Sequence, residues 1–257
     1  MSVATESFAL TKEEVSFFLE NGYLGPLTAF TPEEMERLRP QVDGVLAEQG
    51  HATCIHHNGK PVDPWQGRHL DRRVVWDLCS HPAVVERMAS IMGPDLVLWR
   101  SNFFVKAPGA KVIPWHQDRN YWPITPEVNI SAWMAIDPAT RENSCVEILP
   151  GSHKQIVRHI KSTPEMGFAE MAATEGLDFS KKVVMELKPG QFFLFNEATL
   201  HHSEPNRSAK RRCGLAIRVT VPCVRVFHHK LYKGHKCVLL RGEDRCGFNE
   251  MAEPPVA

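Results

Sequence analysis

Two short segments, far apart along the chain, carry side chains that commonly bind transition metals. The first is His116-Gln117-Asp118 and the second is His201-His202. In an extended strand, residues i and i+2 point to the same side, so His116 and Asp118 can reach one ion. Two imidazoles and one carboxylate on one face of a metal are typical of mononuclear non-haem iron sites. A hydrogen-bonded surface pair is the alternative for His116 and Asp118, and the pair alone does not decide.

The third ligand must come from the second segment, which follows an apolar stretch at 191–196. His201 and His202 point to opposite sides of an extended backbone, so one of them can face the metal. Strand alternation does not decide which. Downstream, Arg212 begins another apolar stretch, and a guanidinium beside an apolar pocket suits bidentate binding of a carboxylate. The alternative for Arg212 is a surface charge at the end of a strand.

Helix signals are concentrated in the first third of the chain. Thr11 and Thr31 are each followed three residues later by a glutamate, which is the capping-box pattern of a helix start. The second start opens a segment with apolar residues at helical spacing, namely Met35, Leu38, Val42, Val45 and Leu46. The helical pattern returns at 72–92 with an interruption at Pro82. Residues 51–69 are rich in Gly, Pro, His and Asn and are expected to form a loop.

Beyond residue 95 the pattern changes to short apolar stretches separated by turn residues. They lie at 96–106, 129–136, 145–149, 182–187, 191–196 and 214–221. Several short strands without alternating helices favour an antiparallel sandwich or a closed double-sheet fold. We therefore expect one domain over 1–257, with a helical front at about 11–92, a core at about 95–221 and a C-terminal extension at 222–257. Residues 250–257 are expected to be a loose tail.

Composition excludes several classes of protein. The formal net charge of the 257 residues is zero, and no basic cluster is long enough to indicate a nucleic-acid partner. No apolar stretch approaches the roughly 18 residues of a membrane span, and the first ten residues lack the pattern of a secretory signal. The seven cysteines are scattered and form no CxxC pair, which favours a reducing compartment. We expect a cytoplasmic protein with no nucleic-acid or membrane partner.

The segments also resemble the phytanoyl-CoA dioxygenase (PhyH) family of iron(II)/2-oxoglutarate oxygenases, from about residue 11 to residue 221. The matching motifs are Asn21-Gly22-Tyr23-Leu24, His116-Gln117-Asp118 with Tyr121-Trp122-Pro123, Glu142 with Cys145, Leu149-Pro150-Gly151-Ser152-His153, and His201 with Ser203, Asn206, Ser208 and Arg212. The motifs occur in order and at family-like spacing, which makes the resemblance specific.

The resemblance implies a mainly β fold with flanking helices, built on a double-stranded β-helix (jelly-roll, cupin-like) core. It selects His201 over His202 as the third ligand of Fe(II). The implied 2-oxoglutarate site consists of Arg212 and Ser203 at the side-chain carboxylate, with Gln117, Trp133 and Asn102 lining the same pocket. Arg119, Tyr121 and Trp122 follow the first ligands and are expected to reach the substrate, although packing beneath the barrel mouth is an equal alternative for Trp122.

The implied reaction uses O2 and decarboxylates 2-oxoglutarate to succinate and CO2 while hydroxylating or desaturating an unactivated C–H bond of a small-molecule metabolite. Related halogenases lack the carboxylate that matches Asp118, so its presence favours hydroxylation or desaturation. Alternatives from other classes are a non-catalytic, cupin-like metal-binding protein or sensor, and a zinc hydrolase on the same ligands. Neither requires Arg212 and Ser203 beside the triad.

The loop at 51–69 and the basic stretch at 225–249 are expected to form a lid that sets substrate choice. Cations of that stretch would favour an anionic substrate if they face the pocket. The alternative is a solvated surface balanced by Glu243 and Asp244. Substrate identity and oligomeric state are not determined by the sequence.

Overall fold

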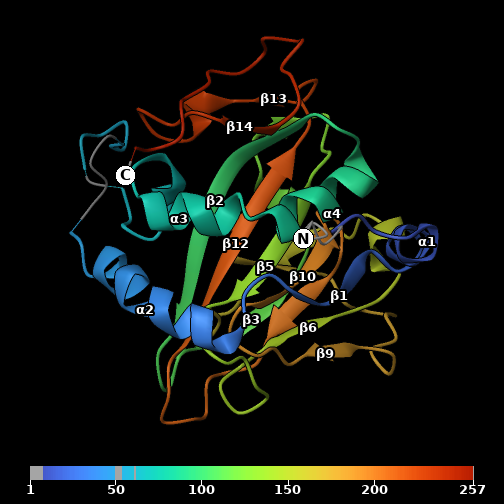
Figure 1. The fold of residues 1–257 in the computed structure, drawn as a ribbon. Helices are drawn as coiled ribbons and strands as arrows, with labels where there is room; N and C mark the ends of the chain where they lie inside the picture. Colours follow the sequence, from blue (N-terminus) through green and yellow to red (C-terminus); the bar gives the residue numbers. More distant parts are fainter. Residues whose placement is uncertain (1–7, 50–53, 61, 257) are drawn as a thin grey trace, which may run out of the picture.

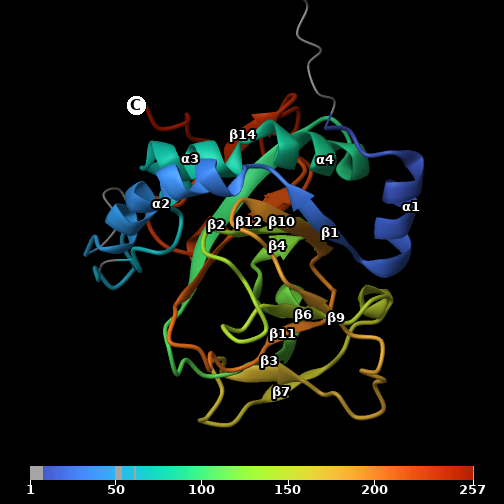
Figure 2. The same ribbon diagram turned by 60° about the horizontal axis from the view of Figure 1, so that its bottom comes forward.

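The computed structural model describes residues 8–49, 54–60 and 62–256. Two antiparallel sheets pack face to face, and helices cover the outer face of the larger sheet. Figure 1 shows the helices α2, α3 and α4 lying across this sheet, and Figure 2 shows the smaller sheet on the other side of it. The expected mainly β architecture with helices at its N-terminal side is confirmed.

The larger sheet has the strand order β1-β10-β5-β12-β2-β14. Its strands are β1 (Tyr23–Thr28), β2 (Leu96–Lys106), β5 (Ile130–Ala135), β10 (Gln191–Asn196), β12 (Arg212–Thr220) and β14 (Val238–Arg241). The smaller sheet has the order β3-β11-β6-β9. Its strands are β3 (Ile113–His116), β6 (Val146–Ile148), β9 (Val183–Met185) and β11 (His201–Ser203). Two further pairs are β4 (Ile124–Thr125) with β13 (Arg225–Val226), and β7 (His159–Lys161) with β8 (Glu170–Ala172).

The α-helices are α1 (Lys12–Asn21), α2 (Pro32–Leu46), α3 (Arg73–Cys79) and α4 (Pro82–Met92). Short 3-10 turns occur at Arg68–Leu70, Asp118–Tyr121, Ser152–Lys154 and His228–Lys230. Both capping boxes form: the Thr31 hydroxyl accepts from the Glu34 amide at 3.2 Å, and the Glu34 carboxylate accepts from the Thr31 amide at 2.8 Å. Thr11 and Glu14 make the same pair of bonds. The break between α3 and α4 places Pro82 in the first turn of α4, where no amide donor is needed.

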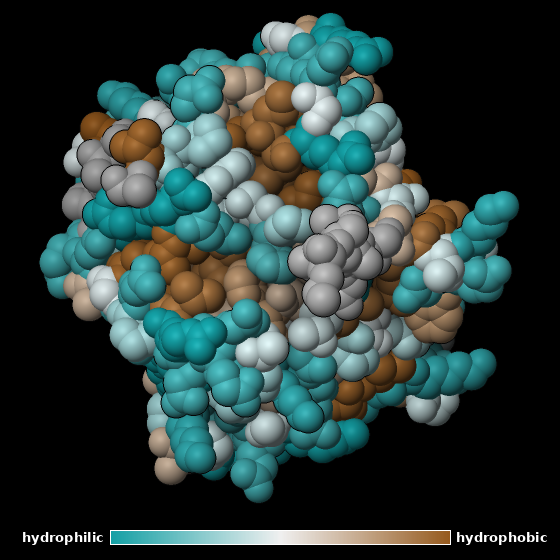
Figure 3. Space-filling view, in the orientation of Figure 1, coloured by the Kyte–Doolittle hydropathy of each residue, from teal (hydrophilic) through white to brown (hydrophobic). Residues whose placement is uncertain are grey.

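The interiors of β5 and β10 are almost entirely apolar because both faces of these strands are buried. On β5 and β10, Met134 and Phe192 pack under the helices, whereas Trp133 and Phe193 fill the space between the two sheets. Continuous burial removes the polar alternation of a half-exposed strand. The surface on the side of the molecule that carries the helices is mostly hydrophilic, and its apolar side chains form separate patches (Figure 3).

The two faces of β12 carry different kinds of side chain. Cys213, Leu215, Ile217 and Val219 pack in the core under the helices. The other face carries Arg212, Gly214, Ala216 and Arg218, which line a cavity between the sheets or pack beside it. The antiparallel register with β2 sets Arg212 opposite Lys106, and Arg218 opposite Arg100. A Cβ atom at Gly214 would lie 2.0 Å from the Trp133 ring, so glycine is required there.

The segment at 54–56 pairs with the C-terminal extension. The Ile55 amide donates to the Lys233 carbonyl at 3.1 Å, and the Lys233 amide donates to the Ile55 carbonyl at 2.8 Å. Cys54, Val62 and Tyr232 form a small buried cluster there. Residues 51–53 and 61 of the expected loop lie outside the described part of the chain. The rest of 51–69 is irregular except for the 3-10 turn that begins at Arg68.

The expectation of a loose tail at 250–257 is wrong at its start. Met251 forms an isolated bridge with Cys237, and the Ala252 amide donates to the Cys237 carbonyl at 2.8 Å. These bonds tie the segment to the body of the fold. Within the described ranges, no helix has both the length and the apolar character needed to cross a membrane.

Candidate metal and co-substrate site

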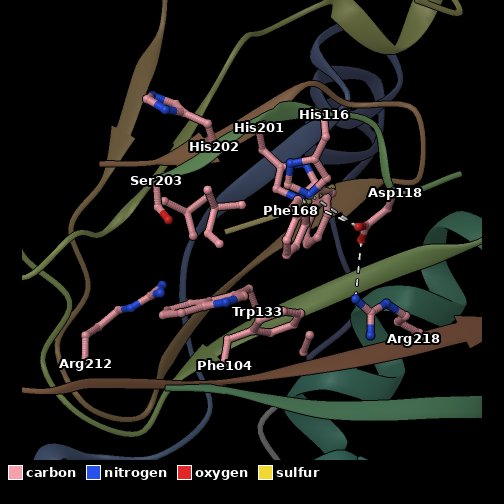
Figure 4. Close-up of a pocket in the computed structure, with 14 residues that line it drawn as sticks. Phe104, His116, Asp118, Trp133, Phe168, His201, His202, Ser203, Arg212 and Arg218 are labelled. Carbon is pink, nitrogen blue, oxygen red and sulfur yellow. Dashed lines mark ion pairs between the residues drawn. The ribbon is translucent and has the colours of Figure 1, made fainter. Parts of the chain in front are cut away.

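His116, Asp118 and His201 converge at one end of the cavity between the sheets (Figure 4). His116 ends β3 and His201 begins β11, and the register places them directly opposite each other. An oxygen of Asp118 lies 3.6 Å from Nε2 of His116 and 4.0 Å from Nε2 of His201. The three candidate ligand atoms lie within 4.8 Å of one another, a spacing that one metal ion can bridge.

Backbone carbonyls orient both imidazoles. Nδ1 of His116 lies 2.8 Å from the Pro114 carbonyl, and Nδ1 of His201 lies 2.9 Å from the Thr199 carbonyl. A carbonyl accepts only, so each Nδ1 carries the proton and each Nε2 offers a lone pair toward Asp118. Burial, followed by the neighbouring His116, lowers the pKa of His201 to about 3. The neutral imidazole that a metal requires is therefore the stable form.

Asp118 is held as a carboxylate. Burial alone would raise its pKa, but the positive charge of the Arg218 guanidinium opposes that effect, and the pKa lies well below its usual range. Arg218 lies 3.7 Å from the second oxygen of Asp118. Its guanidinium packs against the rings of Trp122, at 5.2 Å, and Phe104, at 5.7 Å. The sequence signal for Arg218, which was not among the expected site residues, is an arginine within an apolar strand at even spacing from Arg212.

His202 leaves the strand on the other side. Its Nε2 lies 2.9 Å from a Glu147 oxygen, and its ring stacks on Trp115 with centroids 4.0 Å apart. Figure 4 shows the ring pointing away from the three converging ligands. The structure thus places His201, the histidine that the family resemblance selected, beside His116 and Asp118.

The opposite end of the cavity is cationic. Arg212 is 3% exposed, its guanidinium carbon lies 5.1 Å from the Trp133 ring centroid, and its Nε has no hydrogen-bond partner within the described residues. Beside it, the Lys106 ammonium donates to the carbonyls of Ser203 and Glu204 at 3.2 and 2.6 Å. Burial lowers the pKa of Arg212 to about 10, and burial together with Arg212 lowers the pKa of Lys106 to about 7. A bound carboxylate would offset both effects.

The residues that we expected around the co-substrate are divided by the structure. Ser203 and Trp133 line the cavity with Arg212. Gln117 is not among the lining residues, because its amide nitrogen donates to the carbonyls of Gln155 and Ala198 at 2.7 and 2.6 Å, and its oxygen accepts from the Val157 amide at 2.9 Å. Asn102 lines a second, outer cavity.

The outer cavity, of about 420 Å³, adjoins the metal end through Asp118 and Arg218, which line both spaces. Tyr121 and Trp122 line it, as expected for substrate contacts, whereas Arg119 forms an ion pair with Glu127 and is not part of its wall. No pattern in the sequence indicated Phe168, which precedes β8. The Phe168 ring lies 4.8 Å from that of His116 and closes the wall between the two cavities.

The donor set suits Fe(II), because two neutral imidazoles and one carboxylate leave positions open for a chelating co-substrate, and the cationic end of the cavity supplies a carboxylate site. The fold and this site define a mononuclear non-haem iron, 2-oxoglutarate-dependent oxygenase. The chain belongs to the phytanoyl-CoA dioxygenase (PhyH) family, whose sequence profile matches residues 18–214.

Individual relatives agree with this assignment. The chain is 27% identical over 226 residues to dioxygenase lolE1 of Epichloe uncinata, covering 80% of this chain and 81% of the relative. It is 26% identical to the peroxisomal phytanoyl-CoA dioxygenase of Rattus norvegicus, covering 77% and 65%. The solved structure of CytC3 with Fe(II) and alpha-ketoglutarate superimposes with a TM-score of 0.77 at 28% identity, covering 96% of this chain and 94% of that one.

Proposed function

We propose that this oxygenase hydroxylates, or desaturates, an unactivated C–H bond of a small-molecule metabolite. The observation that carries the proposal is the arrangement of His116, Asp118 and His201 at one end of a cavity whose other end holds Arg212. When bound, iron with 2-oxoglutarate and O2 supplies the oxidising chemistry, and 2-oxoglutarate leaves as succinate and CO2. The protein supplies binding, orientation and exclusion of water.

Each part of the chain has a defined task in this proposal. His116, Asp118 and His201 hold Fe(II), with both imidazoles fixed by backbone carbonyls. Arg212, held against Trp133, binds the distal carboxylate of 2-oxoglutarate together with Ser203. A buried, water-poor cavity strengthens these charge-assisted bonds.

The outer cavity is the proposed substrate site. Its volume of about 420 Å³ falls in the range of small-molecule pockets. Tyr121 and Trp122 provide aromatic surface, and Phe168 lies between this cavity and the metal end. The paired segments around Ile55 and Lys233 flank the adjoining hollow lined by His56 and Tyr232, where a lid would act. The seven free cysteines support a reducing, cytoplasmic location.

The test combines a spectrum with a product assay. Under anaerobic conditions, Fe(II) and 2-oxoglutarate are expected to give a weak metal-to-ligand absorption band in the visible. Succinate release is then screened with O2 across a metabolite panel, with Asp118→Ala as the inactive control. Retention of zinc through purification, with no band and no succinate, would contradict the proposal and favour a hydrolase or a non-catalytic metal-binding protein.

A further inference from the structure

The inner face of β2 and β12 carries two pairs of cations, one at each end. Lys106 lies opposite Arg212, and Arg100 lies opposite Arg218. Like charges directly opposite each other on an antiparallel pair are destabilising, so each pair requires a nearby anion. At the first end, the proposed anion is the carboxylate of 2-oxoglutarate. At the second end, Asp118 neutralises Arg218 at 3.7 Å.

Among the described residues, Arg100 has no counter-charge as close as this, and Asp118 acts on it only from farther away. The hydrogen-bond partner of Arg100 is neutral: one guanidinium nitrogen donates to the Gln66 amide oxygen at 2.7 Å. Its Nε is buried without a hydrogen-bond partner, and no carboxylate of the described residues lies within ion-pair distance of it. A guanidinium held out of bulk water without an anion is costly. Burial accordingly lowers the pKa of Arg100.

Arg100 stands where the two outer hollows meet. It lines the cavity that contains Asp118 and Asn102, and also the adjoining hollow that contains Lys230 and Tyr232. Among the described residues that line these two spaces, Asp118 is the sole carboxylate, and it is engaged by Arg218 and the metal site. The Tyr232 hydroxyl, which can donate to an anion, is buried without a partner among the described residues. The region is therefore short of anionic oxygen.

We propose that Arg100 is a specificity residue that binds an anionic oxygen group, a carboxylate or a phosphate, of the molecule that this oxygenase oxidises. That the anion belongs to a substrate rests on the proposed function. Anion binding at Arg100 is itself a property of the protein without iron or 2-oxoglutarate. The anion site at Arg100 is distinct from the basic C-terminal stretch, whose cations were also expected to favour an anionic substrate. Arg241 and Arg245 of that stretch pair with Glu86 and Glu243, so their charges are already compensated.

Anion binding can be measured without turnover. The parent protein carries Arg212→Gln, which removes the co-substrate end, and is titrated by calorimetry with benzoate, phenyl phosphate and the neutral analogue benzamide. Benzoate or phenyl phosphate is expected to bind saturably, and Arg100→Gln is expected to weaken that binding by about tenfold or more, with benzamide unaffected. The stronger of the two anions identifies the chemical group.

Lys230→Gln is the matched comparison, because Lys230 is the cation of the C-terminal extension that lines the same hollow. Its anion affinity is expected to stay within about twofold of the parent. The proposal is overturned if neither anion binds saturably, if Arg100→Gln binds as tightly as the parent, or if the loss occurs in Lys230→Gln instead.

Should Arg100→Gln fail to fold, Arg100→Lys carries the test, because one ammonium cannot form the paired bonds of a guanidinium. Weaker binding of the preferred anion supports the proposal, and unchanged affinity overturns it. The visible band of the native protein with Fe(II) and 2-oxoglutarate reports separately on the proposed function. A missing band with intact anion binding, or the reverse, shows which of the two has failed.

Discussion

His201 and His202 are neighbours on β11 whose imidazoles lie on opposite sides of the strand. His201 points toward Asp118 at the metal end of the cavity, whereas Nε2 of His202 lies 2.9 Å from a Glu147 oxygen on the other side of the strand. The two positions therefore differ in their surroundings although they carry the same side chain, one residue apart.

This pair provides a matched test of the metal site. His201→Ala removes one of three ligands and is expected to lower Fe(II) affinity by at least about 100-fold, with loss of the visible band. His202→Ala is expected to keep metal binding and to cost about 1–2 kcal/mol of stability, because the Glu147 carboxylate loses a buried partner. Metal content measured after dialysis distinguishes them. Equal metal loss in both variants would contradict the assignment.

A second adjacent pair tests the co-substrate end. Arg212 lies in the cavity, whereas Arg211 points outward, with its Nε 2.9 Å from Asp137 and an Nη 2.5 Å from Asp43. Arg212→Gln is expected to weaken 2-oxoglutarate binding on the order of 10- to 100-fold, because a charge-assisted pair is lost. Arg211→Gln is expected to lower stability with little change in affinity. Titration of the visible band gives both affinities, and similar values for the two variants would contradict the assignment.

Gln117 is expected to stabilise the fold rather than to bind the co-substrate. Its amide bonds three backbone groups, at Gln155, Val157 and Ala198, and none of these bonds faces the co-substrate. Gln117→Leu leaves those buried groups without partners and is expected to cost about 3 kcal/mol in urea unfolding. Gln191→Leu, which loses one bond to Lys188 near the surface, is the milder control. A larger effect on 2-oxoglutarate affinity than on stability would support the sequence-based placement of Gln117 in the co-substrate pocket.

The strands that could be predicted from the sequence are those with enough apolar residues to form a pattern. β2 and β10 were expected with the bounds that the structure gives, because they are long and buried. β3 and β11 carry His116 and His201 but are four and three residues long, too short to form an apolar pattern, so their pairing is set by partners distant in sequence. The choice of His201 came from the family resemblance, since alternation is symmetric between neighbours.

The charges of the substrate side could not be derived in the same way. Arg218 and Arg100 become neighbours only through the register of β12 with β2, which a single sequence does not define. The sequence instead drew attention to the basic residues after 225, because their charges are dense along the chain. Arg241 is paired with Glu86, which is 155 residues away and therefore invisible to a local pattern.

Glu197 gives the fold a pH dependence that is separate from the metal ligands. It lies in the turn between β10 and β11, is 7% exposed, and has one carboxylate oxygen without a partner among the described residues. Burial raises its pKa from 4.5 to about 7. Between pH 4.5 and about pH 7, Glu197 keeps its proton in the folded state but has released it in the unfolded state. The free energy of unfolding therefore falls as pH rises through this window. Above pH 7 the full cost of the buried charge remains.

Glu197→Gln keeps the shape of the side chain and removes the charge. The variant is expected to raise the free energy of unfolding at pH 8 by up to about 3 kcal/mol and to change it little at pH 5, near the lower end of the window. Urea unfolding at a series of pH values between 4 and 8 measures this difference. Glu142→Gln, at an exposed glutamate, is the control and should give a curve parallel to that of the native protein. If the Glu197→Gln curve is also parallel to that of the native protein, the pKa of Glu197 is not raised by folding. The variant is more stable at high pH only if the native carboxyl group becomes charged within this pH window while it is buried.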